Sequence, residues 1–112
     1  MFKLKPLMPS LKERNRYLVL EVVSETKIDD KRLKESIITS VLKFLGELEL
    51  AKAGLKIIDL KNNKIIIKAT HLYVDKIKTA LILIKKIDNK NIIIKTVNVT
   101  GSLKKARLKM ED

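Results

Sequence analysis

The chain has 112 residues, and its 25 Lys and Arg residues outnumber its 13 Asp and Glu residues, which gives a net charge of +12. This length excludes a two-domain enzyme, and 46% hydrophobic residues beside 34% charged ones exclude general disorder. Cysteine is absent, which excludes disulfides and thiolate chemistry, and no apolar run has the length of a membrane span or signal peptide. We therefore expect one intracellular, cytoplasmic domain, whose charge reflects either a solubilising surface or an anionic partner.

Residues 1–15 contain both prolines, Pro6 and Pro9, and several basic side chains without a strand or helix period. We expect this segment to form an N-terminal arm. From Arg16 the sequence becomes rich in β-branched and apolar residues, which predicts a first strand over residues 17–23.

An amphipathic helix is predicted next. Asp29 and Asp30 supply an N-cap and negative charge in the first turn. Hydrophobic residues then recur at steps of three and four, as one helix face requires. These residues are Leu33, Ile37, Val41, Phe44, Leu45 and Leu48.

Two apolar segments, over residues 55–60 and 64–69, are separated by Asn62 and Asn63. Asn tolerates the positive φ angles of a two-residue turn, so these segments are predicted to form a β-hairpin. Thr70 is then expected to cap a second helix that ends near Asp88 and Asn89. The apolar stripe of that helix is Val74, Ile77, Leu81 and Ile84.

A fourth strand is predicted over residues 91–99, and Gly101 ends it. The expected order is β-α-β-β-α-β, an α+β ferredoxin-like or RNA-recognition-like sandwich with both helices on one face of an antiparallel sheet. We divide the chain into an arm (1–15), the sandwich (16–100) and a basic C-terminal tail (101–112).

Catalysis by the polypeptide is not expected. The single histidine, His71, has no second histidine to work with and is better explained as a polar residue in a first helical turn. Asp29 and Asp30 are better explained as a helix start than as a metal pair. The three glycines are isolated and form no phosphate-binding loop. We predict no catalytic residue and no cofactor or metal bound by the protein.

Nucleic-acid binding is a better candidate, through phosphates rather than bases. The third strand reads KIIIKAT and lacks the aromatic residues on which RNA-recognition sheets stack bases. Affinity would then depend on cations that contact phosphates.

The cations gather in two segments. Residues 12–16 hold Lys12, Arg14 and Arg16, and residues 104–109 hold four cations and no acid. Because the first and last strands are neighbours in the expected fold, these segments are predicted to form one patch, and mapping to opposite ends would contradict it. Solvated tails without a partner are the alternative.

The face of the sheet away from the helices is also predicted to carry apolar residues. Tyr17, Val19 and Val23 share this face, and Ile66 joins them beside Lys68. An uncovered apolar face indicates a protein partner, for which Val19, Val23 and Ile66 are the candidate contacts. The alternative is that the terminal arms fold back over it.

These features resemble the small protein subunits of archaeal and eukaryotic ribonuclease P, the ribonuclease P protein component 2 family. The segments that carry the resemblance are PSLKERNRYLVLEV (9–22), GELELAKAG (46–54), YVDKIKTALILI (73–84) and TGSLKKARLK (100–109). The resemblance implies a non-catalytic subunit of a ribonucleoprotein whose RNA removes the 5′ leader of precursor tRNA with magnesium bound to the RNA.

The resemblance also implies partners: the ribonuclease P RNA, ribonuclease P protein component 3 in a heterotetramer with two copies of each, other protein subunits, and precursor tRNA indirectly. Lys12 stands where the family has Arg, which weakens bidentate phosphate recognition there. The main alternative is a ribosomal or other RNA-scaffolding protein. The implied RNA contacts are Lys12, Arg14, Arg16, Tyr17, Gly101, Ser102, Lys104, Lys105 and Arg107.

Overall fold

The structure is a computed structural model that describes residues 14–87 and 89–111. Its elements follow one another as β1 (Asn15–Ser24), α1 (Asp30–Leu45), α2 (Glu47–Ala53), β2 (Lys56–Lys61), β3 (Lys64–Thr70), the 3₁₀ turn η2 (His71–Tyr73), α3 (Val74–Ile82), β4 (Lys86–Ile87), β5 (Lys90–Thr100) and α4 (Leu103–Glu111).

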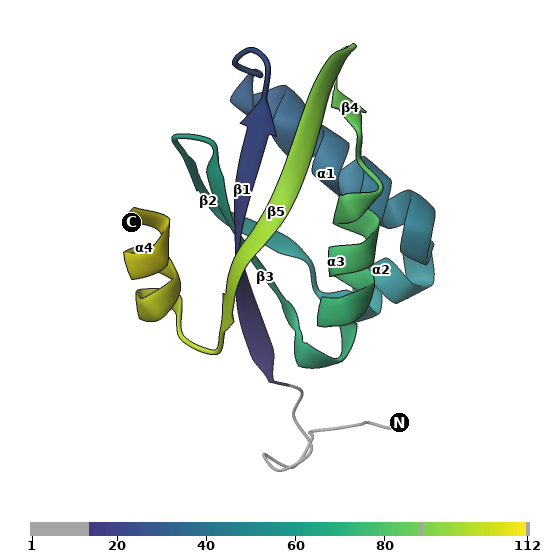
Figure 1. The fold of residues 1–112 in the computed structure, drawn as a ribbon. Coiled ribbons are helices and arrows are strands. Elements are labelled where there is room, and N and C mark those ends of the chain that lie inside the picture. Colours follow the sequence, from purple (N-terminus) through teal and green to yellow (C-terminus); the bar gives the residue numbers. More distant parts are fainter. Residues whose placement is uncertain (1–13, 88, 112) are drawn as a thin grey trace.

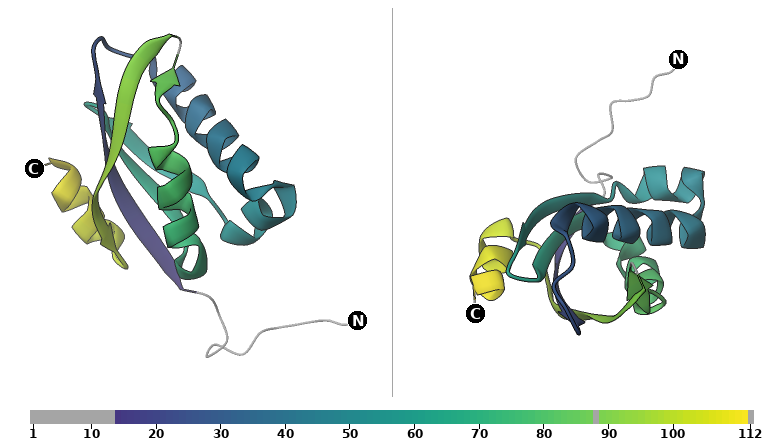
Figure 2. Two further views of the ribbon diagram at one scale, coloured as in Figure 1. Left: turned by 45° about the vertical axis from the view of Figure 1, so that its right-hand side comes forward. Right: turned by 90° about the horizontal axis from the view of Figure 1, so that it is seen from above.

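The strands form one antiparallel sheet in the order β2-β3-β1-β5-β4. Helices α1, α2 and α3 lie on one side of this curled sheet and α4 lies on the other, as Figures 1 and 2 show. The fold is therefore mixed α+β and is compatible with a ferredoxin-like arrangement. The predicted order differs from the observed one, because α2, β4 and α4 are additional elements.

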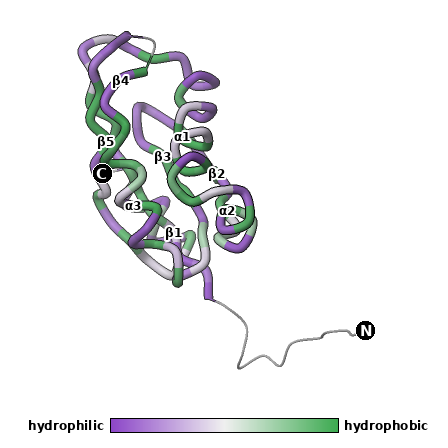
Figure 3. Tube along the Cα trace, turned by 90° about the vertical axis from the view of Figure 1, so that its right-hand side faces the viewer, coloured by the Kyte–Doolittle hydropathy of each residue, from purple (hydrophilic) through white to green (hydrophobic). Residues whose placement is uncertain are grey.

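Successive side chains of the central strand β1 point to opposite faces of the sheet. Leu18 and Leu20 of β1 are fully buried on the helical face, where they join Ile37 of α1 and Ile77 of α3 in the main core. Hydrophobic and hydrophilic segments are interleaved along the trace in Figure 3, as expected for elements with one buried face. Within the described ranges, no helix is both long and apolar enough to cross a membrane.

The β2–β3 hairpin matches its prediction. Asn62 and Asn63 form the two-residue turn with φ angles of 51° and 64°. Positive φ at both central residues is what a type I′ turn requires, and this turn matches the natural twist of the strands.

The predicted helices differ from the observed ones at their ends. Gly46, with φ of 87°, separates α1 from α2, so Leu48 lies in a second helix and is 69% exposed. Asp29 occupies the N-cap of α1, but its side chain makes no capping hydrogen bond. The second predicted helix starts with η2, and the chain leaves α3 after Ile82 to form β4. Thr70 precedes η2 without a side-chain capping bond.

Candidate nucleic-acid interface

At one end of the sheet, the first predicted cation segment lies next to the residues that lead into the second. Tyr17 of β1 pairs with Thr100 of β5, which places the residues on either side of this pair next to one another. The Nη1 atom of Arg16 lies 3.4 Å from the position that a Cβ atom at Gly101 would take. Arg16 of the first segment therefore lies beside Gly101, which precedes the second segment in the chain. That the cations of both segments form one patch stays a prediction.

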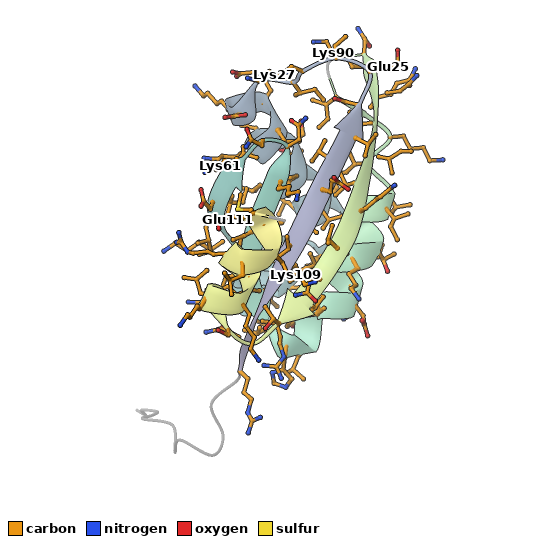
Figure 4. The ribbon with its side chains drawn as sticks, turned by 60° about the vertical axis from the view of Figure 1, so that its left-hand side comes forward. Glu25, Lys27, Lys61, Lys90, Lys109 and Glu111 are labelled. Atoms are coloured by element: carbon orange, nitrogen blue, oxygen red, sulfur yellow. The ribbon has the colours of Figure 1, made fainter. Side chains whose placement is uncertain are left out.

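Two hydrogen bonds connect neighbouring segments at the opposite end of the sheet. Lys90 Nζ donates to the carbonyl oxygen of Lys27 at 3.3 Å, and Asn91 Nδ2 donates to Glu25 Oε1 at 2.8 Å. Figure 4 shows Glu25, Lys27 and Lys90 together at this end, far along the sheet from the Arg16 end. Arg16 and Gly101 therefore lie at the end of the sheet opposite to these contacts.

Arg16 and Gly101 fit one another. The half-buried Arg16 side chain donates from Nη1 to the carbonyl oxygen of Asn15 at 3.1 Å, and this bond holds the guanidinium beside the chain. Gly101 does not have a positive φ angle, so no backbone requirement explains a glycine there. A side chain larger than a methyl group at this position would meet the guanidinium.

Arg14 is tied to the start of η2 through its backbone. The Arg14 N–H donates to Nδ1 of His71 at 3.2 Å, and the His71 N–H donates to the Arg14 carbonyl oxygen at 2.7 Å. The predicted structural role of His71 is consistent with these bonds, since its ring fixes the backbone at the start of β1. The exposed Arg14 side chain extends from this fixed point.

The C-terminal tail forms helix α4, which packs on the outer face of the sheet. The sequence predicted a separate basic tail here, whereas the structure makes these residues part of the folded domain. Ala106 and Met110, four residues apart on one helix face, are buried with Val19 and Ile66, while Leu103 packs at the edge of this cluster.

This packing corrects the predicted protein interface. Val19 and Ile66 are fully buried beneath α4 and are not accessible to a partner in this structure. The alternative prediction, in which a terminal segment folds back over the sheet, holds for these two residues. Val23 lies beyond the helix and is 44% exposed.

Ser102 begins α4. Its Oγ atom accepts a hydrogen bond from the Lys105 N–H at 3.3 Å, and its carbonyl oxygen accepts one from the Ala106 N–H at 3.0 Å. The Thr100 Oγ1 atom accepts a further bond from the Ser102 N–H at 3.3 Å. Ser102 therefore acts as the N-cap, and Lys104 and Lys105 are exposed on the first turn, where the helix end also carries positive partial charge.

Arg107 is directed toward β2. Its Nη1 atom lies 3.8 Å from Asp59 Oδ2, and both side chains remain partly exposed, at 53% and 39%. The two residues also line a cavity of about 350 Å³ between the β2–β3 hairpin and the C-terminal end of α4. Figure 4 shows Lys61 and Glu111 on either side of this region. Arg107 thus forms an ion pair with a carboxylate, whereas Lys104 and Lys105 form none with the residues that the structure describes.

Tyr17 has a mixed environment. It is half-buried against the cluster under α4, and it pairs with Lys68 of β3 on one side and Thr100 of β5 on the other. Lys68 in turn pairs with Lys56 of β2. The sequence pattern placed Lys68 on this face, but neither lysine was predicted as an RNA contact. The position of Lys56 opposite Lys68 depends on a bulge in β2 at Ile58.

Lys12 lies outside the described residues. Within the described part of the chain, no three His, Asp or Glu side chains gather where they could hold a metal ion. The arrangement offers exposed cations on a rigid frame, which suits the neutralisation of phosphate charge.

A family model described as the Rpp14/Pop5 family matches residues 16–111. This chain belongs to the Rpp14/Pop5 family. Among its relatives are proteins named Ribonuclease P protein component 2 from Pyrococcus abyssi and Archaeoglobus fulgidus. The first is 34% identical, covering 96% of this chain and 92% of the relative, and the second is 29% identical, covering 95% and 96%.

A chain in the cryo-EM structure of yeast Ribonuclease MRP shares the fold. Its TM-score is 0.66 at 11% identity, and the match covers 89% of this chain and 88% of that chain. The Rpp14/Pop5 match begins at Arg16 and ends in α4. The patch at Arg16 and Gly101 and the helix that covers the sheet therefore both lie within the family region.

Proposed function

We propose that this chain is a protein subunit of a ribonuclease P ribonucleoprotein, in which it stabilises the RNA that removes the 5′ leader of precursor tRNA. The observation that carries the proposal is membership of the Rpp14/Pop5 family over residues 16–111, together with relatives named Ribonuclease P protein component 2. The site supports an electrostatic role in this assembly, with cations on a folded frame.

In this proposal the protein supplies no proton donor or acceptor to the reaction. Folding an RNA active site brings phosphates together, and fixed cations reduce their mutual repulsion. Arg16, held beside Gly101, and the exposed Lys104 and Lys105 are suited to this task. Catalysis belongs to the RNA, and the magnesium ions are bound by the RNA.

The assembly is proposed to include ribonuclease P protein component 3 in a heterotetramer with two copies of each chain, together with other protein subunits. The exposed apolar residues Val23 and Ile93 support a protein contact, because they pair across β1 and β5 and are 44% and 58% exposed. This pair replaces Val19 and Ile66 as the proposed interface. Precursor tRNA is contacted indirectly, and the complex acts in the cytoplasm.

Reconstitution tests the proposal. This chain, ribonuclease P protein component 3 and the ribonuclease P RNA are combined, and cleavage of precursor tRNA is measured at limiting magnesium. We expect the rate to fall when this chain is omitted and to recover as magnesium is raised. Cleavage that does not depend on the chain would contradict the proposed function and favour another RNA-scaffolding role.

The salt dependence of RNA binding tests the proposed contacts. Each phosphate neutralised on a duplex contributes about 0.9 to the slope of log K against log salt. Replacement of Lys104, Lys105 and Arg107 by Ala is expected to flatten this slope. A slope that stays unchanged in a folded variant would reject these residues as RNA contacts.

A further inference from the structure

The β2–β3 hairpin carries two lysine pairs on the outer face of the sheet. Lys56 is directly opposite Lys68, and Lys61 is directly opposite Lys64. Opposed residues in an antiparallel sheet have Cβ atoms about 4.5–5.5 Å apart, and like charges at such positions destabilise the sheet. None of the four ammonium groups forms an ion pair with another residue of the described ranges.

The surroundings of the two pairs differ. Lys64 is opposite Glu21 of β1, and Lys61 and Lys64 line the cavity that also contains Asp59 and Glu111. Carboxylates on three neighbouring elements therefore reduce the positive potential around this pair. The electrostatic attraction of Lys61 and Lys64 for a phosphate is therefore weaker than that of a lysine pair without nearby carboxylates.

The other pair has no carboxylate in its row of the sheet. Across the four strands, Lys56 is followed by Lys68, Tyr17 and Thr100. Thr100 directly precedes Gly101, over which the Arg16 guanidinium lies. The row thus runs from the edge strand β2 to the end of the sheet at which Arg16 and Gly101 lie.

The bulge in β2 determines on which face of the sheet Lys56 lies. Ile67 pairs with Ile57, and Ile66 pairs with Asp59, so Ile58 is the extra residue in β2. Ile58 packs on the cluster beneath α4, whereas Ile57 packs on the main core. Lys56 consequently lies on the same outer face as Lys68 and Tyr17.

We propose that Lys56 and Lys68 form a second phosphate-binding element on the outer face of the sheet, which extends the RNA interface from the end of the sheet at Arg16 and Gly101 to the edge strand β2. The inference rests on the proposed RNA-binding function. A phosphate backbone near both lysines offsets the repulsion that the free protein carries. The half-buried stem of Lys68, beside Tyr17, holds its charge in place with little loss of side-chain freedom on binding.

The test compares two double variants of the full chain that differ only in position. K56Q/K68Q removes the proposed contacts, and K61Q/K64Q removes the other lysine pair of the same hairpin with the same change in net charge. Binding to the ribonuclease P RNA is measured between low and high salt, together with the thermal unfolding of each free protein. K56Q/K68Q is expected to unfold at or above the wild-type temperature, since it relieves repulsion. K61Q/K64Q is expected to unfold near that temperature, because it also removes the lysine opposite Glu21.

We expect K56Q/K68Q to reduce the log–log salt slope by about 1.8 on a duplex contact, or about 1.4 on a single strand, since two phosphate contacts are lost. The reduction expected for K61Q/K64Q is less than about half of that for K56Q/K68Q. A second readout is acylation of lysines by a soluble reagent. RNA should protect Lys56 and Lys68 more strongly than Lys61 and Lys64.

Equal effects of the two variants would overturn the inference, because they would show a response to net charge alone. A salt slope of RNA binding that is the same in K56Q/K68Q as in the wild type would also overturn it. This result is expected if these lysines contact an acidic protein instead of RNA. Either result leaves the proposed function intact when the wild-type chain binds the RNA with a steep slope. A wild-type chain that does not bind the RNA would overturn both.

Discussion

The guanidinium of Arg16 lies over Gly101, with Nη1 3.4 Å from the position of a Cβ atom at residue 101. This contact joins the first residues of β1 to the turn between β5 and α4. It brings together two segments that are far apart in the sequence.

Replacement of Gly101 by Leu is expected to displace the Arg16 guanidinium and to weaken RNA binding about as much as Arg16→Gln does. Gly101→Ala is the control. Its added Cβ atom would make an ordinary contact of 3.4 Å with a flexible side chain, and the backbone is not left-handed. The free energy of unfolding should change by less than about 0.5 kcal/mol for this variant. Equal RNA affinity for G101L and the wild type, measured by titration, would exclude the contact from the interface.

Asp59→Asn is expected to strengthen RNA binding by releasing Arg107. The Asp59 Oδ1 atom accepts a hydrogen bond from the Leu60 N–H at 2.9 Å, and an asparagine oxygen can keep it. The ion pair with Arg107 is exposed, so its loss should cost less than about 1 kcal/mol of stability. The gain in affinity should disappear in an Arg107→Gln background, and Asp75→Asn, with the same charge change on α3, controls for net charge. A gain that persists without Arg107 would show that this side chain is not involved.

Met110→Ala is expected to loosen α4 and to lower the free energy of unfolding by about 2 kcal/mol, because Met110 is buried on Val19 and Ile66. Leu108→Ala on the same helix removes a side chain that is 57% exposed and should cost less than about 0.5 kcal/mol. Denaturant unfolding measures both values. Hydrogen exchange at the α4 amides should become faster in M110A alone. Similar costs for the two variants would contradict the packing of α4 on the sheet.

Thr70→Val is expected to raise the free energy of unfolding by about 1 kcal/mol. The Thr70 Oγ1 atom is buried and has no hydrogen-bond partner within the described part of the chain, and such a hydroxyl carries a desolvation cost. Valine has nearly the same shape and lacks the hydroxyl. Thr79→Val is the matched control, since the exposed Thr79 hydroxyl donates to the Asp75 carbonyl oxygen at 3.0 Å and should gain nothing from the change. A destabilised T70V protein in thermal unfolding would indicate that the hydroxyl has a partner in solution.

Local patterns in the sequence predicted much of the fold. The alternation in β1 placed Leu18 and Leu20 on one face, and the helical stripes of α1 and α3 identified Ile37 and Ile77 as core residues. These predictions succeed because strand and helix periods depend on neighbouring residues. The break at Gly46 was missed, because the apolar spacing continues through it and only the backbone angle separates α1 from α2.

The sequence also predicted the candidate interface in outline. The topology implied that residues near Arg16 and Gly101 are neighbours, and the structure confirms it. It did not assign Lys56 to the interface, because a single bulge at Ile58 decides which residues of β2 share a face with Lys68.

By itself, the sequence determined an α+β domain with a large positive charge, a hairpin turn at Asn62 and Asn63, and a basic segment at each end. The tertiary structure decided whether the outer face of the sheet is open. The segment Leu103–Glu111 is only nine residues long, and an isolated helix of this length is marginal in water. Its helical state depends on burying Ala106 and Met110 against Val19 and Ile66, residues distant in the chain. For this reason the covered face, and the row of cations beside it, emerge only from the folded molecule.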